Sequence, residues 1–67
     1  MIIANRIREL RTEKNISRTI LAKEVDVDRK VIYNWESGVN EPKASNIITL
    51  ANFFGVSADY LLGLKDY

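Results

Sequence analysis

The sequence predicts an all-α fold of five short helices. Two observations support this. Along most of the chain, apolar residues recur at intervals of three and four, as they do on one face of an α-helix. Between these stretches stand residues that begin helices, namely Ser17, Asp28 and Ser57, and residues that end them. The helices are expected at about 2–14, 18–25, 29–36, 44–54 and 58–62.

The first helix, 2–14, is indicated by Ile3, Ile7 and Leu10, which repeat at i, i+4 and i+7 and should point inward. Its charged residues, including Arg6, are expected to be mostly solvated. Asn15 should end the helix, because asparagine tolerates positive φ better than most residues.

Helices 18–25 and 29–36 form a pair. Leu21 and Val25 have i, i+4 spacing, and Ile32 and Trp35 have i, i+3 spacing, while the periodicity breaks between them. Asp28 can cap the second helix with its carboxylate. Two short helices joined by a tight turn are a helix-turn-helix, which here covers 18–37.

The remaining elements follow the same logic. Gly38 ends the third helix, and Pro42 keeps the loop after it extended. The fourth helix shows an inward face at i, i+3, i+4 and i+7, made of Ile47, Leu50, Ala51 and Phe54. Gly55 ends it, and Gly63 ends the short fifth helix.

Composition limits the function. With 67 residues the chain is expected to be one small domain, 1–67. It has no cysteine and no histidine, so it lacks the usual means of building a disulfide framework, a metal site or a general base. We therefore expect no enzyme activity, no metal, no cofactor and no small-molecule ligand. No apolar run approaches the roughly 20 residues of a membrane span, so no membrane partner is expected. The absence of cysteine is compatible with a reducing cytoplasm, which is the expected location.

The third helix has two unlike faces. Ile32 and Trp35 lie on one side with Asp28, while Arg29, Lys30, Tyr33, Asn34 and Ser37 lie on the other. Side chains of the second kind can reach base edges and phosphates in DNA. The helix alone leaves an ordinary solvated face equally open. The formal net charge is only +1, so any positive surface must come from arrangement.

Two further features concern contacts outside the core. Arg18 stands at the start of the second helix, where it either holds a phosphate or is simply solvated. The C-terminal part contains more apolar residues than one small core needs, and some of them should be exposed. We expect a weak dimer surface there, and scattered partial burial is the alternative. The residues assigned to this surface are Phe53, Tyr60, Leu62 and Leu64.

With five helices placed, the chain resembles the Cro and phage-repressor (XRE-type) helix-turn-helix family over about residues 4–63. The matching segments, in order, are I-R-E-L-R (7–11), I-S (16–17), L-A (21–22), V-x-V (25–27), I-Y-N-W-E-S-G (32–38), E-P (41–42), L-A-N-F-F-G-V-S (50–57) and D-Y-L-L-G (59–63). The resemblance implies a compact five-helix, lambda-repressor-like DNA-binding domain.

The resemblance also implies residue roles. It assigns base reading to Arg29, Lys30, Tyr33 and Asn34, and phosphate contacts to Arg18, Ser37, Asn40 and Lys43. It assigns a structural ion pair to Arg11 and Glu36. Arg18 replaces the glutamine that is usual in the family, which contacts phosphate and braces a reading side chain. An arginine keeps the phosphate role and can lose the bracing role.

Two positions depart from the family pattern. Asp26 stands where the family usually has glycine in the turn, and aspartate can adopt the left-handed conformation at modest cost. Asp28 replaces the usual Ser or Thr cap. Both put negative charge near the expected DNA surface and should lower nonspecific affinity.

The sequence therefore predicts a sequence-specific DNA-binding transcriptional regulator, expected to be a repressor. A homodimer would place helix 29–36 of each copy in the major groove of near-palindromic double-stranded DNA. The alternative is a protein-interaction module of the same fold, such as an antitoxin or an anti-repressor partner.

Overall fold

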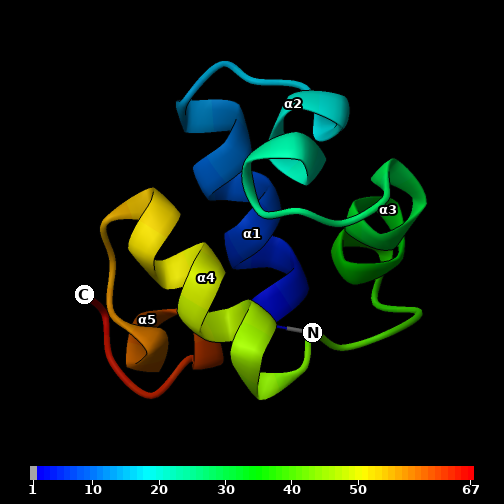
Figure 1. Cartoon of the computed structure of the whole chain (residues 1–67). Helices are drawn as coiled ribbons and strands as arrows, with labels where there is room; N and C mark the ends of the chain where they lie inside the picture. Colours follow the sequence, from blue (N-terminus) through cyan, green and yellow to red (C-terminus); the bar gives the residue numbers. More distant parts are fainter. Residues whose placement is uncertain (1) are drawn as a thin grey trace.

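The computed structural model describes residues 2–67, which form five α-helices. The helices are α1 (Ile2–Glu13), α2 (Arg18–Glu24), α3 (Arg29–Ser37), α4 (Ala44–Phe54) and α5 (Ala58–Leu62). Figure 1 shows α1 in the middle of the molecule, with α2 and α3 towards one side and α4 and α5 towards the other. The all-α prediction is confirmed.

The core draws one large, fully buried side chain from every helix. These five side chains are Ile7, Leu21, Ile32, Leu50 and Leu61. They belong to one hydrophobic cluster that also contains Trp35 and Val25. A helix of five to twelve residues is marginal in isolation, so this shared core supplies most of the stability of each one.

Local chemistry at the helix starts follows the sequence. Ser17 Oγ accepts a hydrogen bond from the Ile20 amide at 3.1 Å, and Ser57 Oγ accepts one from the Tyr60 amide at 3.0 Å. Asp28 Oδ1 accepts one from the Lys30 amide at 2.9 Å. These caps satisfy amides that have no partner inside their helix, which fixes where α2, α3 and α5 begin.

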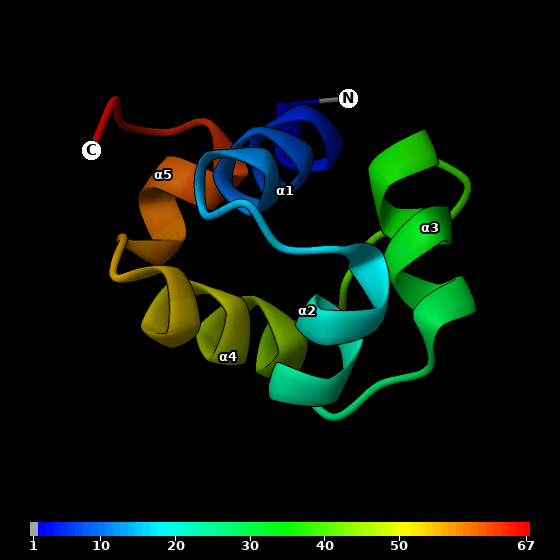
Figure 2. The same ribbon diagram turned by 90° about the horizontal axis from the view of Figure 1, so that it is seen from above.

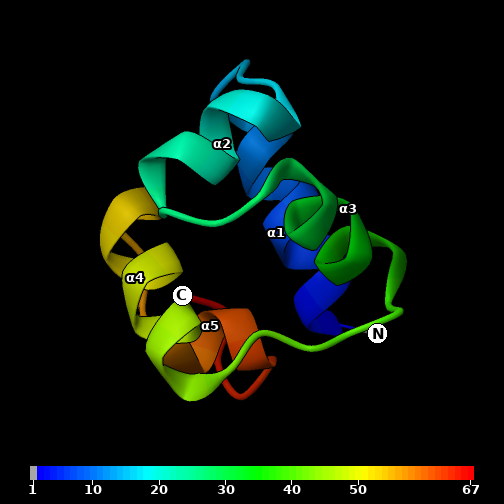
Figure 3. The same ribbon diagram turned by 45° about the vertical axis from the view of Figure 1, so that its right-hand side comes forward.

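The turns between helices also have the predicted backbone. Asn15 and Asp26 adopt positive φ, at 58° and 60°. Asp26 thus takes the left-handed conformation in the turn of the helix-turn-helix, and the turn is retained without the usual glycine. Figure 3 shows this turn connecting α2 to the start of α3.

Three predicted helix ends are wrong by one residue. Lys14 lies in the turn after α1, although its amide still donates to the Leu10 carbonyl. Val25 is the C-cap of α2 rather than its last residue. Ser37 belongs to α3, because the left-handed conformation that ends the helix is adopted by Gly38. Such fraying at helix ends depends on single hydrogen bonds.

Arg6 departs from its predicted solvation. Its guanidinium donates hydrogen bonds to the carbonyls of Tyr60 and Lys65 and lies 4.1 Å from the centre of the Tyr60 ring. Arg6 therefore holds the residues after α5 against α1. Figure 2 shows this C-terminal segment on the opposite side of the molecule from α3.

Within residues 2–67, no helix is both long enough and apolar enough to cross a membrane.

Candidate nucleic-acid interface

The two faces of α3 differ in burial as the sequence predicts. Ile32 and Trp35 lie in the core, whereas Arg29, Lys30 and Tyr33 are exposed. Asn34 is half-buried, and Ser37 is exposed. The helix therefore presents a row of cationic and polar side chains on one side of the molecule.

A hollow of about 470 Å³ lies between the first turns of α2 and α3. Its lining contains three cationic side chains and no acidic one. The lining residues are Ser17, Arg18, Thr19, Arg29, Lys30 and Tyr33. Ser17 and Thr19 were not predicted to lie on this surface, although both flank Arg18. Hydroxyls beside guanidinium and ammonium groups are suited to binding phosphate oxygens.

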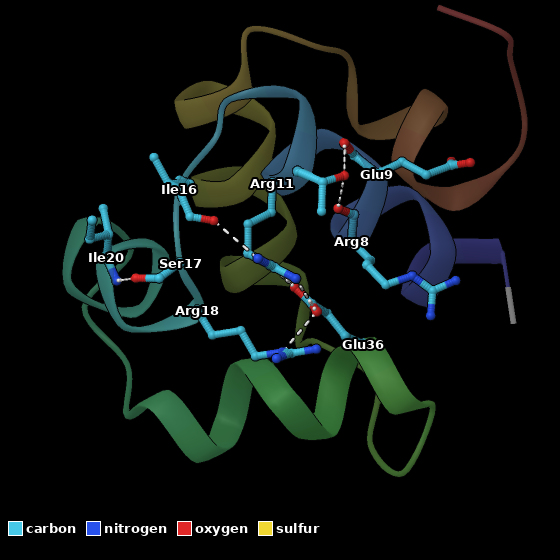
Figure 4. Close-up of polar contacts among 9 residues, drawn as sticks. Arg8, Glu9, Arg11, Ile16, Ser17, Arg18, Ile20 and Glu36 are labelled. Carbon is cyan, nitrogen blue, oxygen red and sulfur yellow. Dashed lines mark hydrogen bonds and ion pairs between the residues drawn. The ribbon is translucent and has the colours of Figure 1, made fainter.

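The carboxylate of Glu36 is the buried anchor behind this surface, with its side chain only 3% exposed. Arg11 Nε donates to Glu36 Oε2 at 2.6 Å, and Arg11 Nη2 donates to Oε1 at 3.2 Å. Arg11 Nη1 also donates to the Ile16 carbonyl at 3.0 Å. Figure 4 shows these contacts joining α1, the α1–α2 connection and α3. The ion pair that the resemblance implies is thus present.

Arg18 is the second partner of Glu36. Arg18 Nε lies 3.0 Å from Glu36 Oε1, and the Arg18 guanidinium carbon lies 5.7 Å from the centre of the Tyr33 ring. Arg18 therefore contacts a residue assigned to base reading. Figure 4 shows Arg18 reaching from the start of α2 to Glu36.

The loop after α3 carries the other residues assigned to phosphates. Asn40 and Lys43 are exposed and line a smaller hollow of about 270 Å³ that also includes Asn34. The Asn34 carbonyl accepts hydrogen bonds from the amides of Val39 and Asn40, at 3.0 and 3.3 Å. These bonds hold the loop close to the end of α3.

The four residues assigned to a dimer surface are unequal in exposure. Leu62 and Leu64 are 45% and 72% exposed. Phe53 and Tyr60 are half-buried, and each ring has a cation above it, Lys14 at 5.2 Å and Arg6 at 4.1 Å. Among these four residues, the apolar surface available to a partner is therefore mainly that of Leu62 and Leu64.

Comparison with known proteins identifies the family. A family model described as a helix-turn-helix domain matches residues 4–66. The chain belongs to the Cro and phage-repressor type of helix-turn-helix family. The structure of this chain is similar to that of the P22 c2 repressor, as seen in a crystal structure of its complex with a synthetic operator. The two chains superpose with a TM-score of 0.90 and are 32% identical. The match covers 97% of this chain and 98% of that one. A solution structure of the P22 c2 DNA-binding domain gives a TM-score of 0.86 at 32% identity, covering 100% of this chain and 91% of that one.

Curated relatives agree with this assignment. The transcriptional activator BcrR of Enterococcus faecalis is 37% identical over 57 residues, which are 85% of this chain and 28% of BcrR. The transcriptional regulator ImmR of Bacillus subtilis is 27% identical over 63 residues, which are 94% of this chain and 50% of ImmR. This helix-turn-helix chain thus spans half or less of the length of these two relatives. Both are named for transcriptional regulation rather than for an enzymatic reaction.

Proposed function

We propose that this chain binds double-stranded DNA in a sequence-specific way and thereby regulates transcription. The observation that carries the proposal is the exposed row of Arg29, Lys30 and Tyr33 on α3, bordering a hollow lined by cations and hydroxyls. The P22 c2 repressor, similar over almost the whole chain, forms a complex with operator DNA. Because its proposed ligand is DNA, we propose that the protein acts in the cytoplasm.

In this proposal the contacts have two functions. Arg29, Lys30, Tyr33 and Asn34 read base edges in the major groove, where each base pair shows a distinct set of donors and acceptors. Arg18, Ser37, Asn40 and Lys43 bind phosphates and fix the position of α3 on the duplex. A net charge of +1 supports only weak nonspecific attraction, so affinity depends on this local arrangement.

The proposal includes a homodimer on DNA. The exposed leucines Leu62 and Leu64, with the half-buried rings of Phe53 and Tyr60, form the surface through which two copies would meet. Two α3 helices about 34 Å apart would occupy successive major grooves on one side of a near-palindromic operator.

The test is selection from a random duplex library at about 0.15 M salt, followed by sequencing of the bound fraction. Enrichment of an inverted repeat, with half-sites about one helical turn apart, is the expected result. Lack of enrichment, with only weak salt-sensitive binding, would overturn the proposal and favour a protein-interaction module.

Variants separate the two kinds of contact. Arg29→Ala and Asn34→Ala should each change the base preferred at one position, whereas Lys43→Ala should weaken binding to all sequences alike and reduce the salt dependence. If Arg29→Ala and Asn34→Ala left affinity and preference unchanged, the assignment of reading residues would be wrong.

The direction of regulation is proposed to be repression, since the protein of the operator complex is a repressor. BcrR is named as an activator, so a reporter assay is needed to decide the sign. A recovered site placed over a reporter promoter should lower expression when the chain is present. A rise in expression would replace repression with activation.

A further inference from the structure

Thr19 differs from the other threonines in the partner of its hydroxyl. Thr12 in α1 and Thr49 in α4 donate from Oγ1 to carbonyls four residues back in the same helix. Thr19 is the second residue of α2, so the residue four positions before it lies outside the helix. Within residues 2–67 the Thr19 hydroxyl makes no hydrogen bond, and Thr19 is exposed.

The surroundings of this hydroxyl are cationic. Thr19 lines the hollow of about 470 Å³ between α2 and α3, whose lining contains no acidic side chain. The three cations in the lining are Arg18, Arg29 and Lys30. Ser17 carries the other aliphatic hydroxyl of the lining, but its Oγ already accepts a backbone amide as the cap of α2. A hydroxyl without a partner therefore shares a hollow with three positive charges.

We propose that Thr19 is a phosphorylation site and that a phosphoryl group on it switches off DNA binding. The donor is ATP, and the catalyst is a serine/threonine kinase. The Thr19 oxygen forms a bond to the γ-phosphorus, the bond from that phosphorus to the β-phosphate oxygen breaks, ADP leaves and the hydroxyl proton is released. This inference rests on the proposed function and adds a means of regulating it.

The charge of a phosphoryl group explains the switch. The group carries a charge of about −1.5 to −2 at pH 7 and three strong acceptor oxygens. Arg29 and Lys30 can give it charge-assisted hydrogen bonds, so the modified chain should stay folded. The same cations are then no longer free for DNA phosphates. Because the formal net charge is only +1, one phosphoryl group also reverses its sign.

The experiment uses the 67-residue chain made by chemical synthesis, either unmodified, phosphorylated at Thr19 or phosphorylated at Thr49. Thr49 is the matched control, because it is an exposed threonine that lines neither hollow and belongs to a helix without charged residues. On the site selected from the duplex library, phosphorylation of Thr19 should weaken binding at least about 100-fold. Phosphorylation of Thr49 should weaken it less than about five-fold, since salt screens a distant charge.

Two measurements on the free protein test whether the cations hold the phosphoryl group. Phosphorus NMR should show a lower second pKa for the phosphate on Thr19 than for the phosphate on Thr49, because positive neighbours favour the dianion. The midpoint of urea unfolding should be no lower in the chain phosphorylated at Thr19 than in the unmodified chain. Equal pKa values for the two phosphates, or a lower midpoint, would overturn the proposed switch.

A labelling experiment tests whether Thr19 is the acceptor. A lysate of the cells that produce the chain is supplied with ATP labelled in the γ-phosphate. Label should enter the wild-type chain and Thr49→Val, and it should be lost in Thr19→Val. Label that persists in Thr19→Val, or the absence of label in the wild-type chain, would overturn the assignment of the site.

Failure of this inference can be told apart from failure of the proposed function. If the unmodified chain enriches no site from the library, the proposed function fails, and the switch fails with it. If the unmodified chain enriches a site, and the chain phosphorylated at Thr19 binds it as tightly as the chain phosphorylated at Thr49, only the inference about Thr19 is overturned.

Discussion

Arginines of α1 hold two regions of this molecule in different ways. On the α3 side, Arg11 binds the buried carboxylate of Glu36. On the C-terminal side, Arg6 binds the carbonyls of Tyr60 and Lys65 and lies 3.9 Å from the fully exposed carboxylate of Asp66. Arg11 neutralises a buried charge, whereas Arg6 has backbone and solvent-exposed partners.

The two sets of contacts differ in the groups that are left without a partner when the arginine or its partner is removed. Loss of either partner in a buried ion pair leaves an uncompensated charge away from water, which is strongly destabilising. Loss of Arg6 exposes carbonyls that water can reach, and an exposed ion pair contributes little. The surface that carries α3 should therefore be rigid, and the segment after α5 should open more easily.

The largest expected effect is at Glu36. Glu36→Gln keeps the shape of the side chain but leaves Arg11 without a carboxylate, and we expect the free energy of unfolding to fall by about 3 kcal/mol. Urea unfolding measures this. Glu24→Gln, at an exposed position in α2, is the control and should change stability by less than about 0.5 kcal/mol. If Glu36→Gln and Glu24→Gln lowered the free energy of unfolding equally, the buried Glu36 carboxylate would not be what holds Arg11 in place.

A second test concerns the packing of the C-terminal side against α1. Gly63 has φ +82°, and an added Cβ would come within 2.8 Å of Ile2 Cγ2. Gly55 has φ +70°, and an added Cβ there would meet nothing within 4 Å. Gly55→Ala should therefore show only the conformational effect of about 1 kcal/mol.

Gly63→Ala should lower the free energy of unfolding by about 2 kcal/mol, because overpacking against Ile2 adds to the conformational effect. Thermal unfolding of the two variants side by side gives the comparison. If Gly63→Ala were no worse than Gly55→Ala, the end of α5 would be free to move away from α1.

A third test removes the contacts of Arg6. Arg6→Met should lower stability by about 1 kcal/mol and accelerate hydrogen exchange of the Leu64 amide, which donates to the Asp59 carbonyl at 2.8 Å. DNA affinity should stay unchanged. Arg8→Met is the control, since within the described residues 2–67 Arg8 Nη2 donates only to Asn5 Oδ1, at 3.3 Å. Unchanged exchange at Leu64 would show that Arg6 does not hold this segment.

The smallest expected effect is at Asp26, in the turn before α3. Asp26→Gly should raise stability by about 0.5 kcal/mol, since glycine adopts φ near 60° without strain. Under the proposed function it should also raise affinity for random-sequence DNA about two-fold, because a negative charge near the phosphates is removed. Asp26→Asn separates the two causes, since asparagine is neutral and tolerates this φ.

Urea unfolding and salt titrations on random-sequence duplex measure these effects. Asp26→Asn should match the affinity gain of Asp26→Gly with little gain in stability. An affinity that stays at the wild-type value in both variants would show that Asp26 lies too far from the DNA to matter.

Local structure was largely predictable from the sequence. The caps at Ser17 and Asp28 and the left-handed residues Asn15 and Asp26 depend on chemistry within a few residues, so a short window contains what is needed. The division of α3 into buried and exposed faces follows from helical period alone. The one-residue errors at helix ends reflect single hydrogen bonds that a pattern does not specify.

The pairing of Arg11 with Glu36 was already implied by the family resemblance, but only the tertiary structure decided which partners Arg18 and Arg6 meet. Arg18 and Glu36 are 18 positions apart, and Arg6 and Lys65 are 59 apart. A flexible arginine can reach many partners. The sequence pattern predicted that Arg6 is solvated, and it left Arg18 open between a phosphate contact and a solvated side chain. The packing of the helices brings two carboxylates, two rings and two carbonyls within reach of these guanidinium groups. The helices and their faces are therefore determined by local sequence, whereas the contacts that connect α1 with α3 and with the C-terminal segment are determined by the packed core.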